Sequence, residues 1–161
     1  SPAGPVFDIK KLDYLNGVYI RQLTDKKLMQ LIEPYLKNCK LIKMIPLLKE
    51  RMSKLTEAGD LVGFFKKAPV YKKDLFKGDQ AKEQLQAITH NLKSIKSWTK
   101  DEIYPAVKKV FSQENYHKKE FFANLYLAIE GRPSGLPVFE SMAILGKTES
   151  LKRLANALKL T

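Results

Sequence analysis

The segment "DQAKEQLQAITHNLKSIKSWTKDE", residues 79–102, decides the fold class. Its apolar residues Leu85, Ile88, Leu92 and Ile95 recur every three or four positions, so they share one face of an α-helix. This spacing predicts a long helix over residues 79–98. A sustained alternation of apolar and polar residues, which would indicate a β-strand, does not occur in the chain. The sequence therefore predicts an all-α fold with no significant sheet.

The last four residues of the same segment mark the start of another helix. The Thr99 hydroxyl can accept a hydrogen bond from a backbone amide three residues on, and the Glu102 carboxylate can accept one from the Thr99 amide. This arrangement is a capping box. Val107, Val110 and Phe111 then continue an apolar helical face, so we expect the helix to begin next to Thr99.

The same periodicity recurs on both sides of this segment. Helical patterns cover residues 8–23, 24–35, 41–55, 56–65 and 118–130, and two short helices lie on either side of Gly146. Asp8, and either Thr24 or Asp25, can cap the first two helices. Pro46 suits the first turn of its helix, and Gly131 is expected to end the helix before it.

A length of 161 residues allows one domain or two small lobes packed together. The irregular connector near residues 66–78 is the best boundary between two lobes. We expect residues 1–7 to be a linker, residues 8–70 a first helical lobe and residues 71–161 a second. The Pro- and Gly-rich start has no initiator Met, so we expect it to be the cut end of a larger protein.

The charge of the chain points to a partner rich in phosphate. Lys and Arg number 29 against 17 Asp and Glu, which gives a net charge of +12 and an isoelectric point near 9.7. Such an excess is typical of proteins that bind nucleic acids. A basic globular domain without a polyanionic partner remains the alternative.

Several classes of site are not expected. Cys39 is the only cysteine, and His90 and His117 lack the spacing of metal ligands, so we expect no metal site. There is no glycine-rich phosphate loop after a strand and no histidine paired with a nucleophile. Acidic pairs such as Asp101–Glu102 suit helix starts. We therefore expect no catalytic residue and no cofactor in this chain. We do not expect the first residues to be a signal peptide, and no apolar run approaches ~18 residues.

Basic residues alternate with aromatic residues in two segments, "FFKKAPVYKK" (64–73) and "SQENYHKKEFF" (112–122). Lysine neutralises phosphates, and aromatic rings stack on unpaired bases. Phe121 and Phe122 fall on an apolar helical face, so we expect both in the core. Trp98 at a helix end is expected to pack rather than to bind a base.

The loop between residues 131 and 139 is unusually constrained. Pro133 and Pro137 rigidify it, and Gly135 would let its backbone approach a ligand closely. Pro137 also suits the start of the next helix, where free amides can meet a polar partner. An ordinary corner between two helices explains the same residues equally well.

Two long motifs together resemble the anticodon-binding region of bacterial-type glutamyl-tRNA synthetases, which are class I enzymes. "FDIKKLDYLNGVYIRQL" (7–23) is similar to the opening pattern F-D-x-x-K-L-x-W-L-N-G-x-Y-I-R of that region, with Tyr14 in place of tryptophan. "AIEGRPSGLPVFESMAILGKTESLKRLANAL" (128–158) is similar to its closing pattern A-L-T-G-x-x-x-G-P-x-L-F-E…L-G-K-E-x-x-L-x-R-L. "LKERMSKL" (48–55) lines up between them, so the resemblance covers the whole chain.

The resemblance implies a cage of two helical lobes that grips the anticodon arm of tRNA-Glu in the cytoplasm. The parent ligase would use ATP and Mg²⁺ in a catalytic region upstream of this chain. The anticodon-binding residues would be Arg51, Tyr126, Arg132, Gly135, Leu136 and Val138. The candidate phosphate contacts are Lys10, Lys11, Arg21, Lys118 and Lys119, each of which could equally be a solvated helix residue.

The resemblance implies that Arg51 reads the third anticodon nucleotide. Cytosine offers the acceptors O2 and N3 on its pairing edge, which suit the donors of a guanidinium, whereas guanine presents a donor there. The family often has Arg at the position of Tyr126 and Thr at the position of Glu130. Tyr126 could stack on a base instead, and Glu130 would repel phosphate unless it accepts from a base or pairs with a lysine.

Three other interpretations were compared with this one. "RMSK" (51–54) superficially resembles the catalytic KMSKS loop of class I synthetases, but no nucleotide-binding fold surrounds it, so we reject that assignment. A free-standing helical module that binds an acidic protein is a second interpretation. The related anticodon cage of class I lysyl-tRNA synthetases is a third.

Overall fold

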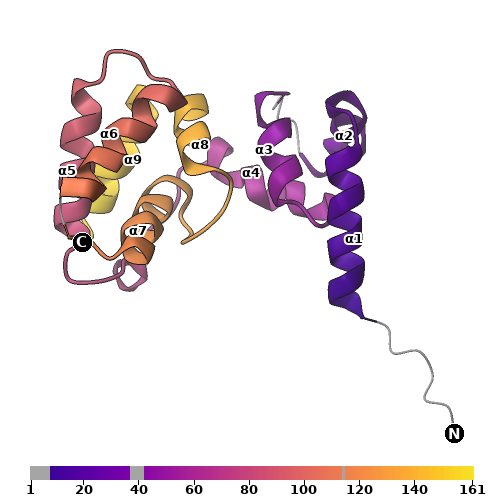
Figure 1. Cartoon of the computed structure of the whole chain (residues 1–161), viewed down its shortest axis with the longest axis horizontal. Helices are drawn as coiled ribbons and strands as arrows, with labels where there is room; N and C mark the ends of the chain where they lie inside the picture. Colours follow the sequence, from indigo (N-terminus) through magenta and orange to yellow (C-terminus); the bar gives the residue numbers. More distant parts are fainter. Residues whose placement is uncertain (1–7, 37–41, 114) are drawn as a thin grey trace, which may run out of the picture. The chain divides into compact units, whose positions relative to one another are not determined.

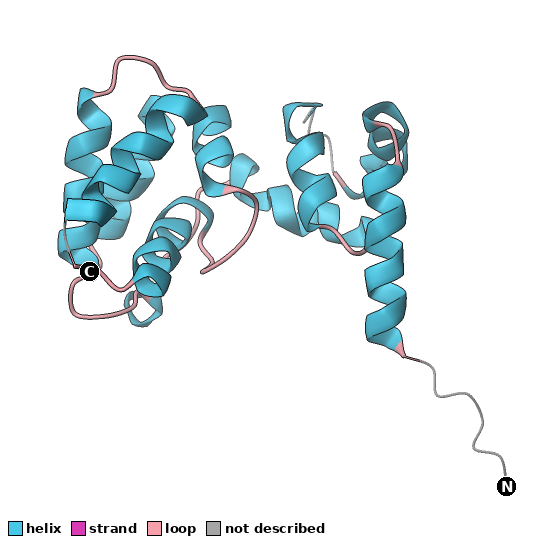
Figure 2. Ribbon diagram, viewed as in Figure 1, coloured by secondary structure: helices cyan, strands magenta, loops and turns pink. Residues whose placement is uncertain are grey.

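The computed structural model describes residues 8–36, 42–113 and 115–161. Within these ranges the chain forms α-helices and short 3₁₀ turns and contains no strand (Figures 1 and 2). The predicted all-α fold without a sheet is confirmed. The helices are α1 (Ile9–Gln22), α2 (Asp25–Ile32), α3 (Ile45–Arg51), α4 (Ala58–Lys66), α5 (Ala81–Ser94), α6 (Lys100–Gln113), α7 (Lys118–Glu130), α8 (Val138–Leu145) and α9 (Lys147–Leu158). The 3₁₀ turns are Glu33–Tyr35, Ile42–Met44, Leu55–Glu57 and Lys73–Leu75.

The chain divides into two compact units, Ser1–Gly63 and Phe64–Thr161. The division falls inside α4, before the connector at residues 66–78. That the two halves act as separate anticodon-binding lobes stays a prediction. The expected linker, residues 1–7, lies outside the described residues, as does Cys39.

The first two helices, α1 and α2, begin at predicted caps. The Asp8 carboxylate accepts from the amides of Lys10 and Lys11 at 2.9 and 3.2 Å, and the Thr24 hydroxyl accepts from the Lys27 amide at 3.2 Å. These caps satisfy amides that the first turn leaves without an intrahelical partner. α3 packs against both α1 and α2. The buried apolar side chains of this unit include Ile20, Leu28, Ile32, Ile45, Leu48 and Met52.

The second unit is a bundle of five helices around one apolar core. α5 packs against α6, α7 and α9, and α8 packs against α6, α7 and α9 (Figure 1). Every one of these helices contributes to the core, as its apolar spacing requires. The core includes Leu85, Ile88, Leu92, Ile103, Val107, Phe121, Leu125, Val138, Met142 and Leu154. The predicted apolar face of α5 is therefore confirmed for its first three members.

The prediction for α5 was wrong at its end. The helix stops at Ser94, and Ile95 has extended backbone angles (φ −69°, ψ 140°). The Lys147 ammonium at the start of α9 donates to the carbonyls of Lys93 and Ile95 at 3.0 and 2.8 Å. A lysine in this place satisfies carbonyls that the helix end leaves open. The Trp98 indole donates to the Met142 carbonyl at 2.7 Å, so this side chain is tied to the bundle.

Candidate nucleic-acid interface

The constrained loop joins α7 to α8 and folds back on the second unit. Gly131 ends α7 in the left-handed conformation (φ 78°), as the sequence predicted. A Cβ at Gly131 would lie 2.5 Å from the Cβ of Pro69, so this position also allows the connector to pack closely. The loop is thus held by glycine at its start and by Pro137 at the N-cap of α8.

A buried carboxylate lies beneath this loop. Glu130 is the last residue of α7, and its side chain is fully buried. It accepts hydrogen bonds from the Leu136 amide at 3.2 Å and from the Ser141 hydroxyl at 3.3 Å. The Arg132 Nε atom lies 3.5 Å from the same carboxylate. Glu130 therefore faces the interior and pairs with an arginine, so it is not an exposed acid that would repel phosphate.

Gly135 has a structural reason to be glycine. A Cβ at this position would overlap the Glu130 carboxylate and would lie 3.0 Å from Arg132 Nε. The sequence predicted that the missing side chain would let a ligand approach the backbone. In the structure the space that a side chain would take is filled by a residue of the same chain.

Burial raises the pKa of Glu130 to about 7, against the opposing effects of Arg132, the Leu136 amide and the Ser141 hydroxyl. The folded state then holds a proton that the unfolded chain releases near pH 4.5. We expect the free energy of unfolding to fall as pH rises from about 5 to 8, because the unfolded chain ionises this carboxyl while the folded state keeps it protonated until about pH 7.

Glu130→Gln should remove this part of the pH dependence, since the amide keeps an acceptor oxygen but carries no charge. We expect the free energy of unfolding to fall less between pH 5 and pH 8 in the variant, by about 1–3 kcal/mol. Urea unfolding at the two pH values measures it. Parallel curves for both proteins would contradict the assignment to Glu130.

The predicted binding residues of the loop differ in exposure. Leu136 and Val138 have buried side chains, so only their backbone could meet a ligand, and the Leu136 amide already donates to Glu130. Arg132 keeps 30% of its side chain exposed, and its guanidinium lies 5.9 Å from the ring centre of Phe64. Among these three residues, Arg132 alone offers a side chain at the surface.

Arg153 on α9 holds the end of α7 in place through hydrogen bonds, a role that the sequence did not reveal. This buried guanidinium donates to the carbonyls of Ile129 and Phe64 and to the Glu149 carboxylate, each at 2.8 Å. The Tyr71 hydroxyl donates to the neighbouring Ala128 carbonyl at 2.7 Å. The residues just before the loop are therefore anchored through their carbonyls, which keeps the loop in place.

A groove of about 610 Å³ runs along one face of α7 and ends at the loop. Lys118 and Lys119 stand at its start, Tyr126 lies two turns further on, and Pro133 borders it from the loop. Lys118, Phe122 and Tyr126 are spaced four residues apart and share one face of α7, which explains why they line the same groove. His117, Phe122 and Ala123 complete the lining.

Two neighbouring aromatic residues of α7 border different surfaces. Phe121 is fully buried, as predicted, and stacks on Tyr116 with ring centres 5.6 Å apart. Phe122 packs against the core, as predicted, and in addition lines the groove. The sequence did not distinguish them because neighbouring residues on α7 lie 100° apart around its axis and border different surfaces.

The other predicted residues belong to the first unit. Arg51 is the last residue of α3 and is exposed, and Lys10, Lys11 and Arg21 are exposed on α1. The turn after Arg51 is fixed on α1. The Asn16 side-chain amide donates to the Ser53 carbonyl, and Lys54 forms an ion pair with Asp13 at 3.0 Å. "RMSK" (51–54) is thus the end of a helix and a docked turn. The sequence predicted that the helix would continue through it.

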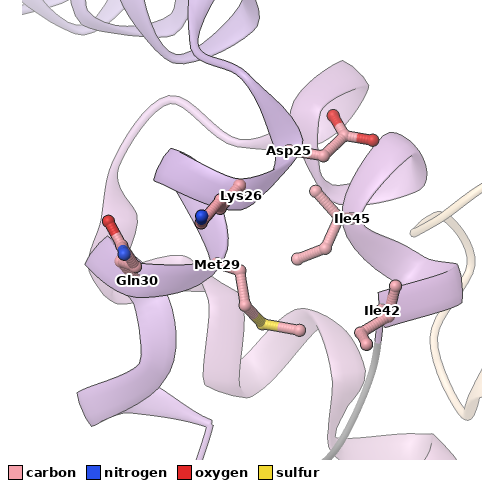
Figure 3. A pocket seen from close by; sticks show the side chains of 6 residues that line it. All are labelled: Asp25, Lys26, Met29, Gln30, Ile42 and Ile45. Atoms are coloured by element: carbon pink, nitrogen blue, oxygen red, sulfur yellow. The ribbon is translucent and has the colours of Figure 1, made fainter.

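A second hollow, of about 460 Å³, lies in the first unit (Figure 3). Met29, Ile42 and Ile45 point toward one another across it, and Asp25 and Lys26 lie at its rim with Gln30. It includes none of the predicted binding residues. In the described part of the chain there is no cluster of side chains that could hold a metal ion, and no helix long and apolar enough to cross a bilayer.

Comparisons with known proteins agree with the sequence analysis. Residues 27–158 match the family described as "Anticodon binding domain". A glutamate–tRNA ligase of Marinomonas sp. (strain MWYL1) is 34% identical over 99% of this chain, and one from Chlamydia trachomatis serovar L2 is 35% identical over 98%. The alignments cover 34% and 33% of those proteins, so the chain spans about a third of their length.

The fold is shared with solved structures. A glutamate tRNA ligase from Elizabethkingia meningosepticum superimposes with a TM-score of 0.77 at 20% identity, covering 98% of this chain and 33% of that one. A glutamate-tRNA synthetase from Elizabethkingia anophelis gives a TM-score of 0.71, also at 20% identity. Since the family match covers most of the sequence, this chain belongs to the anticodon binding domain family.

Proposed function

We propose that this chain recognises the anticodon arm of tRNA-Glu as the anticodon-binding part of a glutamate–tRNA ligase. Its relatives carry that name, and the chain matches about a third of their length. The parent would activate glutamate with ATP and Mg²⁺ in another region of the same polypeptide. Such an enzyme would work in the cytoplasm.

The groove on α7 is the observation that carries this proposal. It combines the two features that recognition of an RNA loop requires, namely cations for phosphates and aromatic faces for unpaired bases. Lys118 and Lys119 are exposed at one end, and the half-buried rings of Phe122 and Tyr126 also line the groove. Arg132 lies next to Pro133 in the bordering loop, where it could contact the same nucleotide.

Direct binding tests the proposal. The chain should bind a tRNA-Glu transcript and its isolated anticodon stem-loop with similar affinity, because the predicted contacts lie in the anticodon arm. A stem-loop with a scrambled anticodon should bind more weakly. Equal binding of both loops would contradict anticodon recognition, and the absence of RNA binding would contradict the function as a whole.

Binding should depend strongly on salt. With a net charge of +12, we expect the chain to neutralise ~3–5 phosphates, so log K should fall with log salt at a slope of roughly −2 to −4. The candidate contacts are Lys10, Lys11, Arg21, Lys118 and Lys119. Fluorescence titrations of the stem-loop at salt concentrations between about 50 and 200 mM measure this slope. A flat dependence would contradict the electrostatic account.

Arg51 is the proposed reader of the last anticodon base. Its guanidinium would donate to O2 and N3 of cytosine, whereas guanine would oppose it with a donor and leave groups unpaired. Arg51→Gln supplies both a donor and an acceptor, so discrimination between loops ending in C and in G should relax by ~1–3 kcal/mol.

The control for Arg51→Gln is Lys43→Gln, which removes the same charge from another exposed position of the first unit. The control should weaken the binding of both stem-loops equally and leave the ratio of the two affinities unchanged. If Arg51→Gln does the same, Arg51 contributes charge only, and Tyr126 and Arg132 are the next residues to test.

A further inference from the structure

Tyr104 on α6 is an exposed aromatic side chain held in a defined orientation. It is 43% exposed, although α6 buries its neighbour Ile103 completely. Its ring meets the ring of Phe139 on α8 edge to face, with centres 5.2 Å apart and planes at 80°. The Lys108 ammonium, one turn further along α6, lies 5.8 Å from the centre of the Tyr104 ring. The ring is thus supported by one neighbour and accompanied by a cation.

The Tyr104 ring is connected to the groove on α7 through a single residue. Phe139 also meets Phe122 edge to face, with ring centres 6.4 Å apart and planes at 89°. Phe122 lines the groove. Three rings from three helices of the same unit therefore form a continuous series from the groove to α6. Edge-to-face contacts of this kind are favourable and hold the rings in fixed relative positions.

We propose that Tyr104 is a second nucleobase platform, on which an unpaired base of the bound RNA stacks beside Lys108. This inference rests on the proposed function, because it assigns a further nucleotide of the same RNA loop. The groove takes one unpaired base, and the nucleotide that follows or precedes it passes over Phe139 to Tyr104. Any of the four bases can stack on an exposed aromatic ring, so this platform adds affinity without adding sequence preference.

Lys108 can support stacking because its side chain is long and exposed and its ammonium lies near the ring. When a base covers the ring, the ammonium can move to the phosphate of the same nucleotide. Lys109, the next residue, is also exposed, but adjacent helical residues point about 100° apart, so Lys109 points in a different direction from Lys108. The two lysines thus form a matched pair, equal in charge and different in position.

Four variants test the platform with the anticodon stem-loop of tRNA-Glu. Tyr104→Phe keeps the ring and should bind as the unaltered chain does. Tyr104→Leu removes it and should weaken binding about five- to one-hundred-fold. Lys108→Gln should weaken binding more than Lys109→Gln. Thermal unfolding of each variant confirms that it is folded, and the lysine pair keeps the test valid should Tyr104→Leu unfold.

A set of stem-loops with one abasic loop nucleotide each identifies the stacked base. Removal of that base should weaken binding to the unaltered chain but should not further weaken binding to Tyr104→Leu. Full affinity of folded Tyr104→Leu, or equal effects of the two lysine variants, would overturn the platform while the proposed function stands. If the unaltered chain binds no stem-loop, the proposed function fails instead.

Discussion

Arg153→Met should be the most destabilising single substitution in the second unit, with a loss of about 3–5 kcal/mol in the free energy of unfolding. The guanidinium donates to two backbone carbonyls, of Ile129 and Phe64, that lie in the interior. Methionine fills a similar volume but donates nothing, so both carbonyls would stay buried without a partner. Urea unfolding of the variant and of the unaltered chain measures the difference.

Two further variants separate this role from charge alone. Arg153→Lys keeps the charge but offers one compact ammonium in place of a planar fork, so it should recover only part of the loss. Lys152→Met changes the exposed neighbour on α9 and should shift stability by no more than about 0.5 kcal/mol. Equal losses of unfolding free energy in Lys152→Met and Arg153→Met would show that the buried hydrogen bonds of Arg153 do not stabilise the fold.

The expected loss at Arg153 has a consequence for recognition. Its contact with the Ile129 carbonyl lies one residue before Glu130 and two before Gly131, where the loop begins. A looser end of α7 would move both the buried carboxylate and the groove side chains on the same helix. RNA binding should therefore weaken in Arg153→Met even though this residue does not face the groove.

Helix starts and stops were predictable because their signals are local. The Asp8 and Thr24 caps, and the end of α7 at Gly131, depend only on residues within one turn of the boundary. The end of α5 was not predictable in the same way. Lys147, more than fifty residues further on, donates hydrogen bonds to carbonyls at the end of α5. No local pattern around Ile95 indicates this contact.

The site residues were predictable in part for the same reason. The spacing of Lys118 and Tyr126 along one helix already places them on one side of α7, where the groove is found, whereas the exposed side of Phe122 between them was not predicted. The inward orientation of Glu130 was not accessible, because it requires the loop to return over the end of its own helix. Sequence spacing gives the face of a helix but not the path of the chain that covers it.

Gly135→Ala is the second substitution that we expect to lower stability strongly, and it tests the packing of the loop on Glu130. The added methyl would overlap the carboxylate, which would have to leave its position. The Leu136 amide and the Ser141 hydroxyl would then lose their acceptor and would stay in the interior without a partner. We expect a loss of about 2–4 kcal/mol in the free energy of unfolding.

A glycine elsewhere in the chain provides the control for Gly135→Ala. A Cβ at Gly63, inside α4, would meet no atom within 4 Å, so Gly63→Ala should raise stability by about 0.5–1 kcal/mol through its helix propensity. The decisive measurement is a double-mutant cycle with Glu130→Ala, which removes the carboxylate that the methyl would strike. In that background Gly135→Ala should cost less than half of what it costs alone, because the two residues compete for one space. Additive losses would contradict the assignment, because they would show that the methyl group and the Glu130 carboxylate do not compete for the same space.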